Sequence, residues 1–206
     1  MDISPLFGLR VQTPQLELRL PALPELERLR EVALAGVHPP EFMPFTVAWT
    51  DVPELTTFLD YHEMRRREWS PEEWHLELGV WLEGEPVGVQ AVTATDFSAA
   101  LAVSTGSWLG ERFQRRGIGT EMRTAVLELA FQGLGADAAR SGAIEGNVAS
   151  LRVSEKLGYH VAGHGTVEPR GIPTVHTDLE LRRGEWRPPF PVEIADLEPS
   201  LPLFGV

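Results

Sequence analysis

The chain has 206 residues, 43% of them hydrophobic, which is enough for one domain with a substantial core. It has no cysteine, which excludes disulfides and thiolate metal sites, and its formal net charge of −12 argues against nucleic acid as a partner. No apolar run is long enough to span a bilayer, and no basic-then-apolar start resembles a signal peptide, so we expect a cytoplasmic protein without membrane contact.

The first half of the chain carries patterns typical of one strand, two helices and three further strands. Leu16 to Leu20 alternates leucine with charged residues, which is the period of a half-buried strand. The Glu83-Gly84-Glu85 turn separates two apolar runs and predicts a hairpin. In chain order we expect a strand at 16–20, helices at 24–36 and 53–69 with an ordered loop at 38–50, and strands at 74–82, 86–95 and 101–109.

The second half of the chain alternates helices and strands. Ile118, Met122 and Val126 recur at helical spacing and form one apolar face. Gly158 ends a shorter helix, and the turn at 170–173 predicts a last hairpin. We expect helices from 118 onward and at 148–157, and strands at 138–144, 159–167 and 174–181. This order predicts an α/β protein with a mixed sheet flanked by helices.

The tail from Arg187 onward differs in composition from the rest of the chain. Repeated prolines disfavour a helix there, yet large apolar residues such as Phe190 and Phe204 are mixed among them. Because a free tail would leave these side chains in water, we expect contact to order it, either across a homodimer or on its own chain. The predicted organisation is one domain at 1–186 followed by a proline-rich apolar arm at 187–206.

Two glycines stand where the helix at 118 begins. Gly117 and Gly119 join the preceding strand directly to the helix, so the first backbone N–H groups stay free and can bind an anion. Glycine lets a bulky ligand approach the backbone closely, and Arg112, Arg115 and Arg116 add positive charge. The sequence therefore predicts a phosphate-binding turn; an ordinary turn that needs glycine for steric reasons is the alternative.

Two common phosphate-binding motifs do not fit this turn. The dinucleotide fingerprint requires a third glycine where the chain has Met122, and the P-loop requires a Gly-Lys-Ser/Thr string that is absent. The remaining pattern, Gln114-x-x-Gly117-x-Gly119, resembles the acyl-CoA pyrophosphate loop of the GNAT acetyltransferases. A second string, AIEGNVASLRVSEKLGYH from Ala143 to His160, resembles the Asn-x-x-Ser and Lys-Leu-Gly-aromatic motif of the ribosomal-protein (Rim-type) branch of that family.

The resemblance to the GNAT family extends from Leu16 to about Trp186, and its closest general likeness is to bacterial members. WLGERFQRRGIGTE is similar to the Tyr-Trp-Leu, Gly-x-Gly and Thr-Glu signature of the Rim-type branch, with Ser107 where the branch usually has tyrosine. The resemblance implies the GNAT fold, with a mixed, mostly antiparallel sheet of about seven strands flanked by about four helices. It also implies that the strands ending near Leu109 and Ile144 splay apart and hold the thioester between them.

This resemblance implies that the chain is an acetyl-CoA-dependent N-acetyltransferase. It would move an acetyl group to a primary amine, on a small molecule or a protein N-terminus, by direct attack on the thioester. We expect no metal, because the histidines lack ligand spacing. The residues assigned to acetyl-CoA are Trp108, Leu109, Arg112, Gln114, Arg115, Arg116, Gly117, Ile118, Gly119, Thr120, Asn147, Ser150 and Ser154.

Three of these residues receive further roles from the resemblance. The backbone N–H of Leu109 would polarise the thioester carbonyl, and Ser150 is the candidate proton donor to the leaving thiolate. Many GNAT proteins use a tyrosine as this acid, at the position that Ser154 occupies here. Asn147 would bind the pantetheine arm, although asparagine is also among the best helix N-caps.

The general base is predicted to be Glu145, at the end of the strand that faces the gap. A water chain is its main rival, and the other candidate residues are Glu111, Asp96, His38, His62, His164 and His176. A non-catalytic acyl-CoA-binding module on the same fold is the alternative function, because Ser154 replaces the acidic tyrosine.

Overall fold

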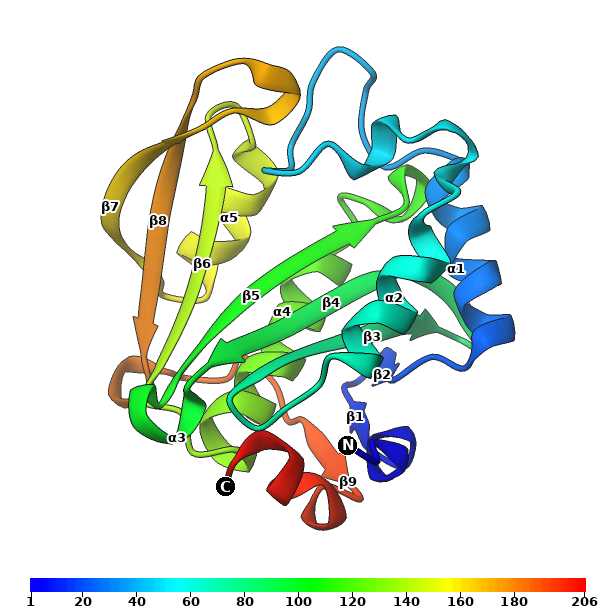
Figure 1. Cartoon of the computed structure of the whole chain (residues 1–206). Coiled ribbons are helices and arrows are strands. Elements are labelled where there is room, and N and C mark those ends of the chain that lie inside the picture. The colour runs from blue at the N-terminus through cyan, green and yellow to red at the C-terminus, as the bar shows by residue number, and fades with distance from the viewer.

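A single sheet of nine strands forms the centre of the structure, in the spatial order β7-β8-β6-β5-β4-β3-β2-β1-β9 (Figure 1). The computed structural model describes all residues, 1–206. β5 and β6 run parallel, and every other neighbouring pair is antiparallel. The strands are β1 (Arg10–Gln12), β2 (Leu16–Arg19), β3 (Glu73–Leu82), β4 (Glu85–Thr95), β5 (Ala102–Leu109), β6 (Ala138–Ile144), β7 (His160–Val167), β8 (Thr174–Arg182) and β9 (Glu193–Ala195).

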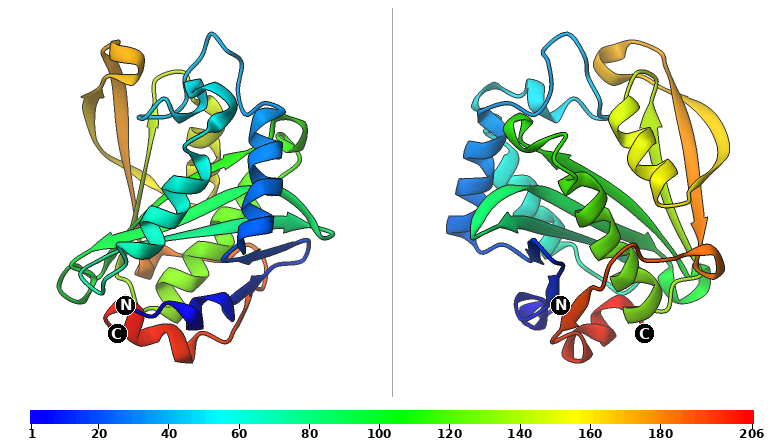
Figure 2. Two further views of the ribbon diagram at one scale, coloured as in Figure 1. Left: turned by 45° about the vertical axis from the view of Figure 1, so that its right-hand side comes forward. Right: turned by 180° about the vertical axis from the view of Figure 1, so that it is seen from behind.

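The structure has five α-helices, of which α3 is a short connection between β4 and β5 and the other four cover the two faces of the sheet: α1 (Leu23–Leu34), α2 (Phe58–Arg67), α3 (Phe97–Ala100), α4 (Ile118–Glu128) and α5 (Val148–Lys156). α1 and α2 lie in front of the sheet in Figure 1, and Figure 2 shows α4 and α5 on the opposite face. None of the helices is both long and apolar enough to cross a membrane.

The predicted α/β class and the mostly antiparallel mixed sheet are confirmed, with small differences in the number of elements. The sheet exceeds the expected seven strands because β1 and the edge strand β9 have only three residues each, too few to show an alternating pattern. The helix expected at 53–69 begins only at Phe58, because Glu54 and Leu55 have φ angles of 53° and 48°. α3 is a single turn that the sequence did not indicate.

The predicted apolar face of α4 is confirmed by its burial. Ile118 and Met122 are each 3% exposed and Val126 is 0% exposed, and all three belong to the large core cluster that also holds Leu76 and Leu78 of β3. A smaller cluster, which includes Leu29 and Phe58, lies under α1 and α2. The sheet is therefore anchored on both faces, and the strand ends around β5 and β6 are held by packed helices.

The C-terminal arm docks on its own chain. β9 pairs with β1, and the side chain of Phe204 is 0% exposed, with its ring centroid 5.5 Å from that of Trp69 and 4.9 Å from that of Trp74. The Trp69 indole N–H donates to the Leu203 carbonyl over 2.8 Å. Leu203 and Phe204 are thus buried within the chain, whereas Phe190 is half-buried. The arm is ordered by contact with its own chain, and a homodimer is not needed to cover Phe204. The prolines exclude an α-helix there but allow a 3-10 helix at Glu198–Phe204.

Candidate functional site

The turn before α4 presents backbone N–H groups that have no partner within the chain. None of the five N–H groups from Arg115 to Gly119 donates a hydrogen bond. Arg115 and Gly117 have left-handed φ angles of 59° and 85°, a pattern that turns successive N–H groups toward one side. The dipole of α4 adds partial positive charge at the same place. The turn therefore suits an anion such as a diphosphate, and we call it the amide nest.

The amide nest is held in place by buried side chains next to it. Ile118 is 3% exposed and anchors the first turn of α4 in the core. The side-chain amide of Gln114 donates to the carbonyls of Val37, over 2.7 Å, and Leu109, over 3.0 Å, which ties the end of β5 to the loop after α1. A Cβ atom added to Gly119 would lie 3.6 Å from Val153 of α5. The nest thus opens where β5, α4 and α5 meet.

β5 and β6 separate beside this point. They pair at three positions only, the last of which joins Ser104 to Arg140. From there the two strands diverge, as Figure 1 shows. The Thr105 hydroxyl still reaches the Arg140 carbonyl over 3.2 Å, so a side chain replaces the next rung of the ladder. The predicted splayed strand pair is present, and we call the gap between the two strands the split.

A buried arginine contacts both strands of the split from the α4 side of the sheet. Arg123 of α4 is 4% exposed, and its guanidinium donates to the hydroxyls of Ser141 on β6, over 2.9 Å, and Ser107 on β5, over 3.4 Å. No carboxylate pairs with it, and its Nε–H has no partner. Arg123 was not among the residues predicted from the sequence. The signal that could have revealed it is an arginine on the apolar side of a helix, with no acidic residue three or four positions away.

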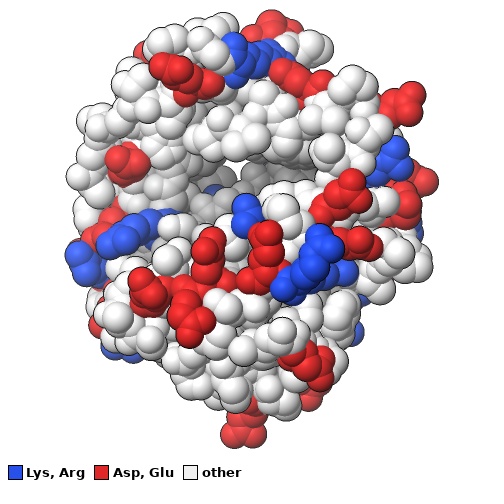
Figure 3. Space-filling view, viewed as in Figure 1, with Lys and Arg blue, Asp and Glu red and all other residues white.

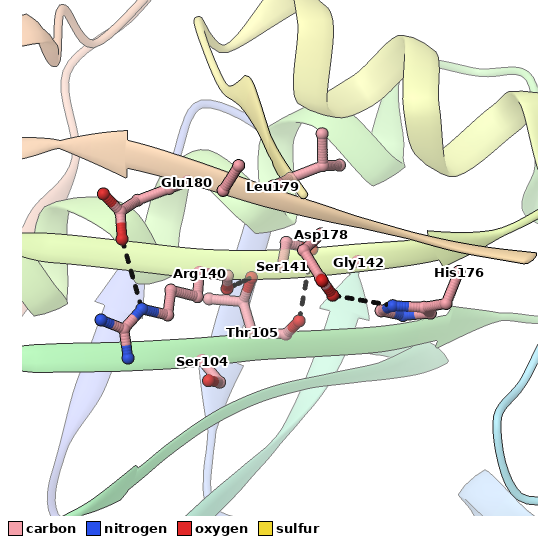
Figure 4. Close-up of a pocket in the computed structure, with 10 residues that line it drawn as sticks. Ser104, Thr105, Arg140, Ser141, Gly142, His176, Asp178, Leu179 and Glu180 are labelled. Carbon is pink, nitrogen blue, oxygen red and sulfur yellow. Dashed lines mark hydrogen bonds and ion pairs between the residues drawn. The ribbon is translucent and has the colours of Figure 1, made fainter. Parts of the chain in front are cut away.

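A cavity of about 430 Å³ opens at the narrow end of the split. Figure 4 shows its polar side chains, which come from β5, β6 and β8. Ser104 shares a strand face with Trp108, which contacts Phe58 of α2, so the cavity lies largely on the α1 and α2 side of the sheet. Figure 3 shows that this side of the molecule is hollowed near its centre. The lining residues are Ser104, Thr105, Arg140, Ser141, Gly142, Ala162, His176, Asp178, Leu179 and Glu180.

A bridge of charged and polar contacts spans the top of the split. The Arg170 guanidinium, between β7 and β8, donates to both carboxylate oxygens of Asp51 over 2.7 Å and to the Pro40 carbonyl over 2.8 Å. The Asp51 carboxylate thereby has a lowered pKa. The loop at 38–50 is thus tied to the β7–β8 hairpin, as the two segments near the top of Figure 1 show.

Comparison with protein families supports the likeness suggested by the sequence. The model of the acetyltransferase (GNAT) domain matches residues 15–160, which is most of the chain. The chain belongs to the GNAT acetyltransferase family.

Solved structures of GNAT proteins share this fold. RimJ from Mycobacterium smegmatis, in complex with CoA-disulfide, is 19% identical, with a TM-score of 0.69, and the match covers 86% of each chain. A ribosomal-protein-S5-alanine acetyltransferase from Vibrio fischeri is 16% identical, with a TM-score of 0.62, over 87% of this chain and 99% of that one. RimL, a ribosomal L7/L12 α-N-protein acetyltransferase in complex with coenzyme A, is 16% identical, with a TM-score of 0.63, over 81% and 94%.

Within this GNAT fold, the residues assigned to the CoA loop differ in whether their side chains are free to bind a ligand. Arg115 and Arg116 are exposed beside the amide nest and make no ion pair. The side-chain N–H groups of Gln114, in contrast, donate to two carbonyls and hold the loop in place, and its predicted contact with the ligand remains a prediction. The Arg112 guanidinium lies 4.5 Å from the Phe113 ring centroid and 4.0 Å from Glu85, so it is only partly available. Thr120 is half-buried, and its hydroxyl makes no hydrogen bond.

The residues predicted around the thioester lie along β5 and α5. Trp108 is half-buried against Trp49 and Phe58, with ring centroids 5.7 and 6.1 Å away, so it packs on the α1 and α2 side of the sheet, and its predicted contact with acetyl-CoA remains a prediction. Leu109 is buried at the end of β5. These contacts do not test whether the Leu109 N–H polarises the thioester carbonyl, and that role remains a prediction.

α5 begins with the predicted Asn-x-x-Ser motif. The Asn147 side-chain oxygen accepts from the Ser150 N–H over 3.1 Å, which makes Asn147 the N-cap, and its amide reaches the Pro44 carbonyl over 3.5 Å. To bind the pantetheine arm, the Asn147 side chain would therefore have to exchange one of these contacts within the chain for a contact with the ligand. The Ser150 hydroxyl is half-buried and has no partner. Ser154 is 0% exposed, and its hydroxyl is also without a partner, so it lies inside the protein rather than on a ligand-facing surface.

The candidate bases differ in how well the structure positions them. Glu145 is exposed at the end of β6, and its carboxylate has no partner. Glu111 is exposed as well. Asp96 stands at the N-cap position of α3, directly after the end of β4 that is remote from Leu109, and its side chain makes no capping hydrogen bond. No group of acidic or histidine side chains is arranged to hold a metal ion.

Each of the four candidate histidines has a different environment. His62 is buried, and burial together with the nearby Arg66 lowers its pKa to about 3. The His38 ring contacts Thr50 over 2.7 Å within the loop, and the His164 ring contacts Thr177 over 3.3 Å. His176 is the one that lines the cavity.

Proposed function

We propose that this protein is an acetyl-CoA-dependent N-acetyltransferase that moves an acetyl group to a primary amine. The observation that carries the proposal is the position of the amide nest at the end of a strand pair that has separated. The nest supplies free N–H donors for the pyrophosphate, and the split leads from there toward a polar cavity. A ligand with an anionic head and a long thin arm matches this shape.

The chain's own residues would supply binding, polarisation and proton transfer. Backbone N–H groups at 115–119, with Arg115 and Arg116, hold the pyrophosphate. The Leu109 N–H polarises the carbonyl, so that the amine can attack directly without an acyl-enzyme. The Ser150 hydroxyl, one turn into α5, delivers a proton to the leaving thiolate with the help of water.

The acceptor is a primary amine of a small molecule or of a protein N-terminus. Two of the structural neighbours are described as acetyltransferases of ribosomal proteins, which supports including peptide N-termini in the proposal. The cavity carries Asp178, which has no arginine partner and whose negative charge suits an ammonium group.

The test is a measurement of CoA release with a thiol reagent. Purified protein is mixed with acetyl-CoA and a panel of small amines and tetrapeptides that begin with alanine, serine or methionine. We expect steady release of CoA with a subset of the panel, and a mass increase of one acetyl group on that acceptor. Acetyl-CoA binding by calorimetry without release on any acceptor would favour the non-catalytic acyl-CoA-binding module instead.

A further inference from the structure

A histidine and an aspartate on β8 form a hydrogen-bonded pair in the cavity beside the split (Figure 4). The distance from Nδ1 of His176 to a carboxylate oxygen of Asp178 is 2.9 Å. With Nδ1 as the donor to this carboxylate, Nε2 carries the free lone pair of the neutral ring. Nε2 has no partner in the chain, and the His176 side chain is 20% exposed and lines the cavity, so the ring is partly open to solvent.

A glycine on β6 makes room for this ring. A Cβ atom at position 142 would collide with Cε1 and Nε2 of His176, so any residue other than Gly142 would displace the ring. β6 is the strand that borders the split, and its Ile144 stands opposite His176 in the ladder. The Nε2 edge of the ring therefore lies against β6. The thioester would lie beside this strand.

The charges around the pair single out Asp178 as the partner of His176. Glu180, the next residue on the same face of β8, already contacts Arg140, over 3.3 Å, and Arg182, over 2.7 Å. Asp178 has no arginine and contacts His176 alone.

The neighbouring strands add little charge near the ring. β7 places only Gly163 and Gly165 opposite Asp178 and His176. β5 contributes the uncharged Ser104 and Thr105 to the cavity, and β6 adds Glu145 just beyond Ile144. A proton taken up at Nε2 is thus balanced chiefly by the Asp178 carboxylate.

We propose that His176 is the general base of the acetyl transfer, and that Asp178 is the residue that positions it. The inference rests on the proposed function. The substrate ammonium gives its first proton to Nε2 of His176, which later returns it to water. The nitrogen lone pair forms the C–N bond, the C–S bond breaks, and sulfur leaves with the electron pair. The second proton of the nitrogen ends on that thiolate, so the products are the amide, the free thiol and one released proton.

The first test compares His176→Gln with Glu145→Gln and His164→Gln. The probes are ethylamine and 2,2,2-trifluoroethylamine, which have similar size, although only the second is largely neutral at neutral pH. For His176→Gln we expect kcat with ethylamine to fall by about 100-fold, a smaller loss with trifluoroethylamine, and an unchanged Kd for acetyl-CoA. Glu145→Gln tests the rival base directly, whereas His164, which does not line the cavity, is the control whose variant should keep wild-type kcat. Equal kcat in His176→Gln and wild type, or the large loss in Glu145→Gln instead, would overturn the assignment.

The second test does not depend on turnover. Nitrogen-15 NMR of the histidine rings reports which ring nitrogen carries the proton. We expect His176 to carry it at Nδ1, and Asp178→Asn to change that signal while leaving the signal of His164 in place. A wild-type ring protonated at Nε2 would remove His176 as a base whether or not either amine reacts. Absence of CoA release from the wild type with all amines would count against the proposed function and leave the NMR result to decide the role of His176.

Discussion

The carboxylate of Glu121 on α4 accepts two hydrogen bonds from Gln15, one from its backbone N–H and one from its side-chain amide, each over 2.8 Å. The Thr13 hydroxyl adds a third, over 2.6 Å. Glu121 is 5% exposed, so these donors replace the water that the buried carboxylate has lost. The helix that begins at the amide nest is thereby fixed to the loop between β1 and β2.

Replacing Glu121 should therefore destabilise the fold. For Glu121→Ala we expect the free energy of unfolding to fall by about 3 kcal/mol, because three donors lose a charged acceptor. Urea denaturation measures the change, and exposed Glu63→Ala on α2 is the control that should change stability little. A loss below about 0.5 kcal/mol would show that this contact does not hold the loop.

The amide nest gives a prediction for binding. Gly117→Val should weaken acetyl-CoA binding at least a few-fold, since a branched side chain at φ 85° would crowd the free N–H groups. Gly135 is the matched control, because it has φ 76° and open space around it but lies away from the nest. Calorimetry should find weaker binding in Gly117→Val and wild-type binding in Gly135→Val. Equal affinity in the wild type and Gly117→Val means that the pyrophosphate lies elsewhere.

Ser150 gives a prediction for the chemical step. Ser150→Ala should lower kcat by about tenfold or more while the Kd for acetyl-CoA stays close to that of the wild type. Ser154→Ala is the matched control on the same helix, because its hydroxyl is buried without a partner and should not affect kcat. Steady-state kinetics with the best acceptor of the panel provides the measurement. An unchanged kcat in Ser150→Ala takes that hydroxyl out of the mechanism.

The burial of His62 predicts acid sensitivity. Its pKa is about 3 in the folded protein and near 6.5 in the unfolded chain, so the unfolded state binds the extra proton between these values. The stabilisation is fully present above pH 6.5 and is lost as the pH falls, with a slope of about 1.4 kcal/mol per pH unit. Relative to the wild type, His62→Phe should gain about 2 kcal/mol between pH 7 and pH 5. Urea titrations at both pH values test this, and a constant difference between the two proteins would contradict it.

The docked arm predicts what truncation does. Deleting 187–206 uncovers Trp69 and Trp74 and removes Phe204, so the melting temperature should fall, with a loss of about 3 kcal/mol or more. Light scattering should register only the missing mass, because the arm contacts its own chain. Deleting the last two residues alone is the control. An unchanged melting temperature would mean that the arm does not stabilise the domain.

Local patterns in the sequence were enough to predict part of this structure. The glycines at 117 and 119 and the apolar periodicity of α4 are short-range signals, and they led correctly to the turn and the helix. The split beside them was predicted only through the resemblance to the GNAT family. The docking of β9 on β1 depends on contacts between distant segments, which no local pattern records. The pairing of His176 with Asp178 above Gly142 depends on the register of β8 against β6 in the same way.

The hydrogen-bond partners of several polar side chains could not be predicted from the sequence. Gln114 and Asn147 are typical ligand-binding residues, but here their amides contact the carbonyls of Val37, Leu109 and Pro44. Of these, Val37 and Pro44 are distant in the sequence and come close only in the fold. The role of Arg123 could not be predicted from the sequence either. The two serines that it contacts lie on different strands and come together only in the fold.

Because β5 and β6 are already separate in the folded protein, no free energy is needed to open the sheet when a ligand binds. Beyond Ser104 the two strands share no backbone rungs, and a few side-chain contacts span the gap. A ligand arm that slides between them has no ladder to break, since folding has already kept the strands apart. Such preorganisation moves an energetic cost from each binding event to the single event of folding. Affinity at this place should then reflect the attraction between the ligand and the walls of the split, and the protein can pass through many cycles of loading and release without disturbing its sheet.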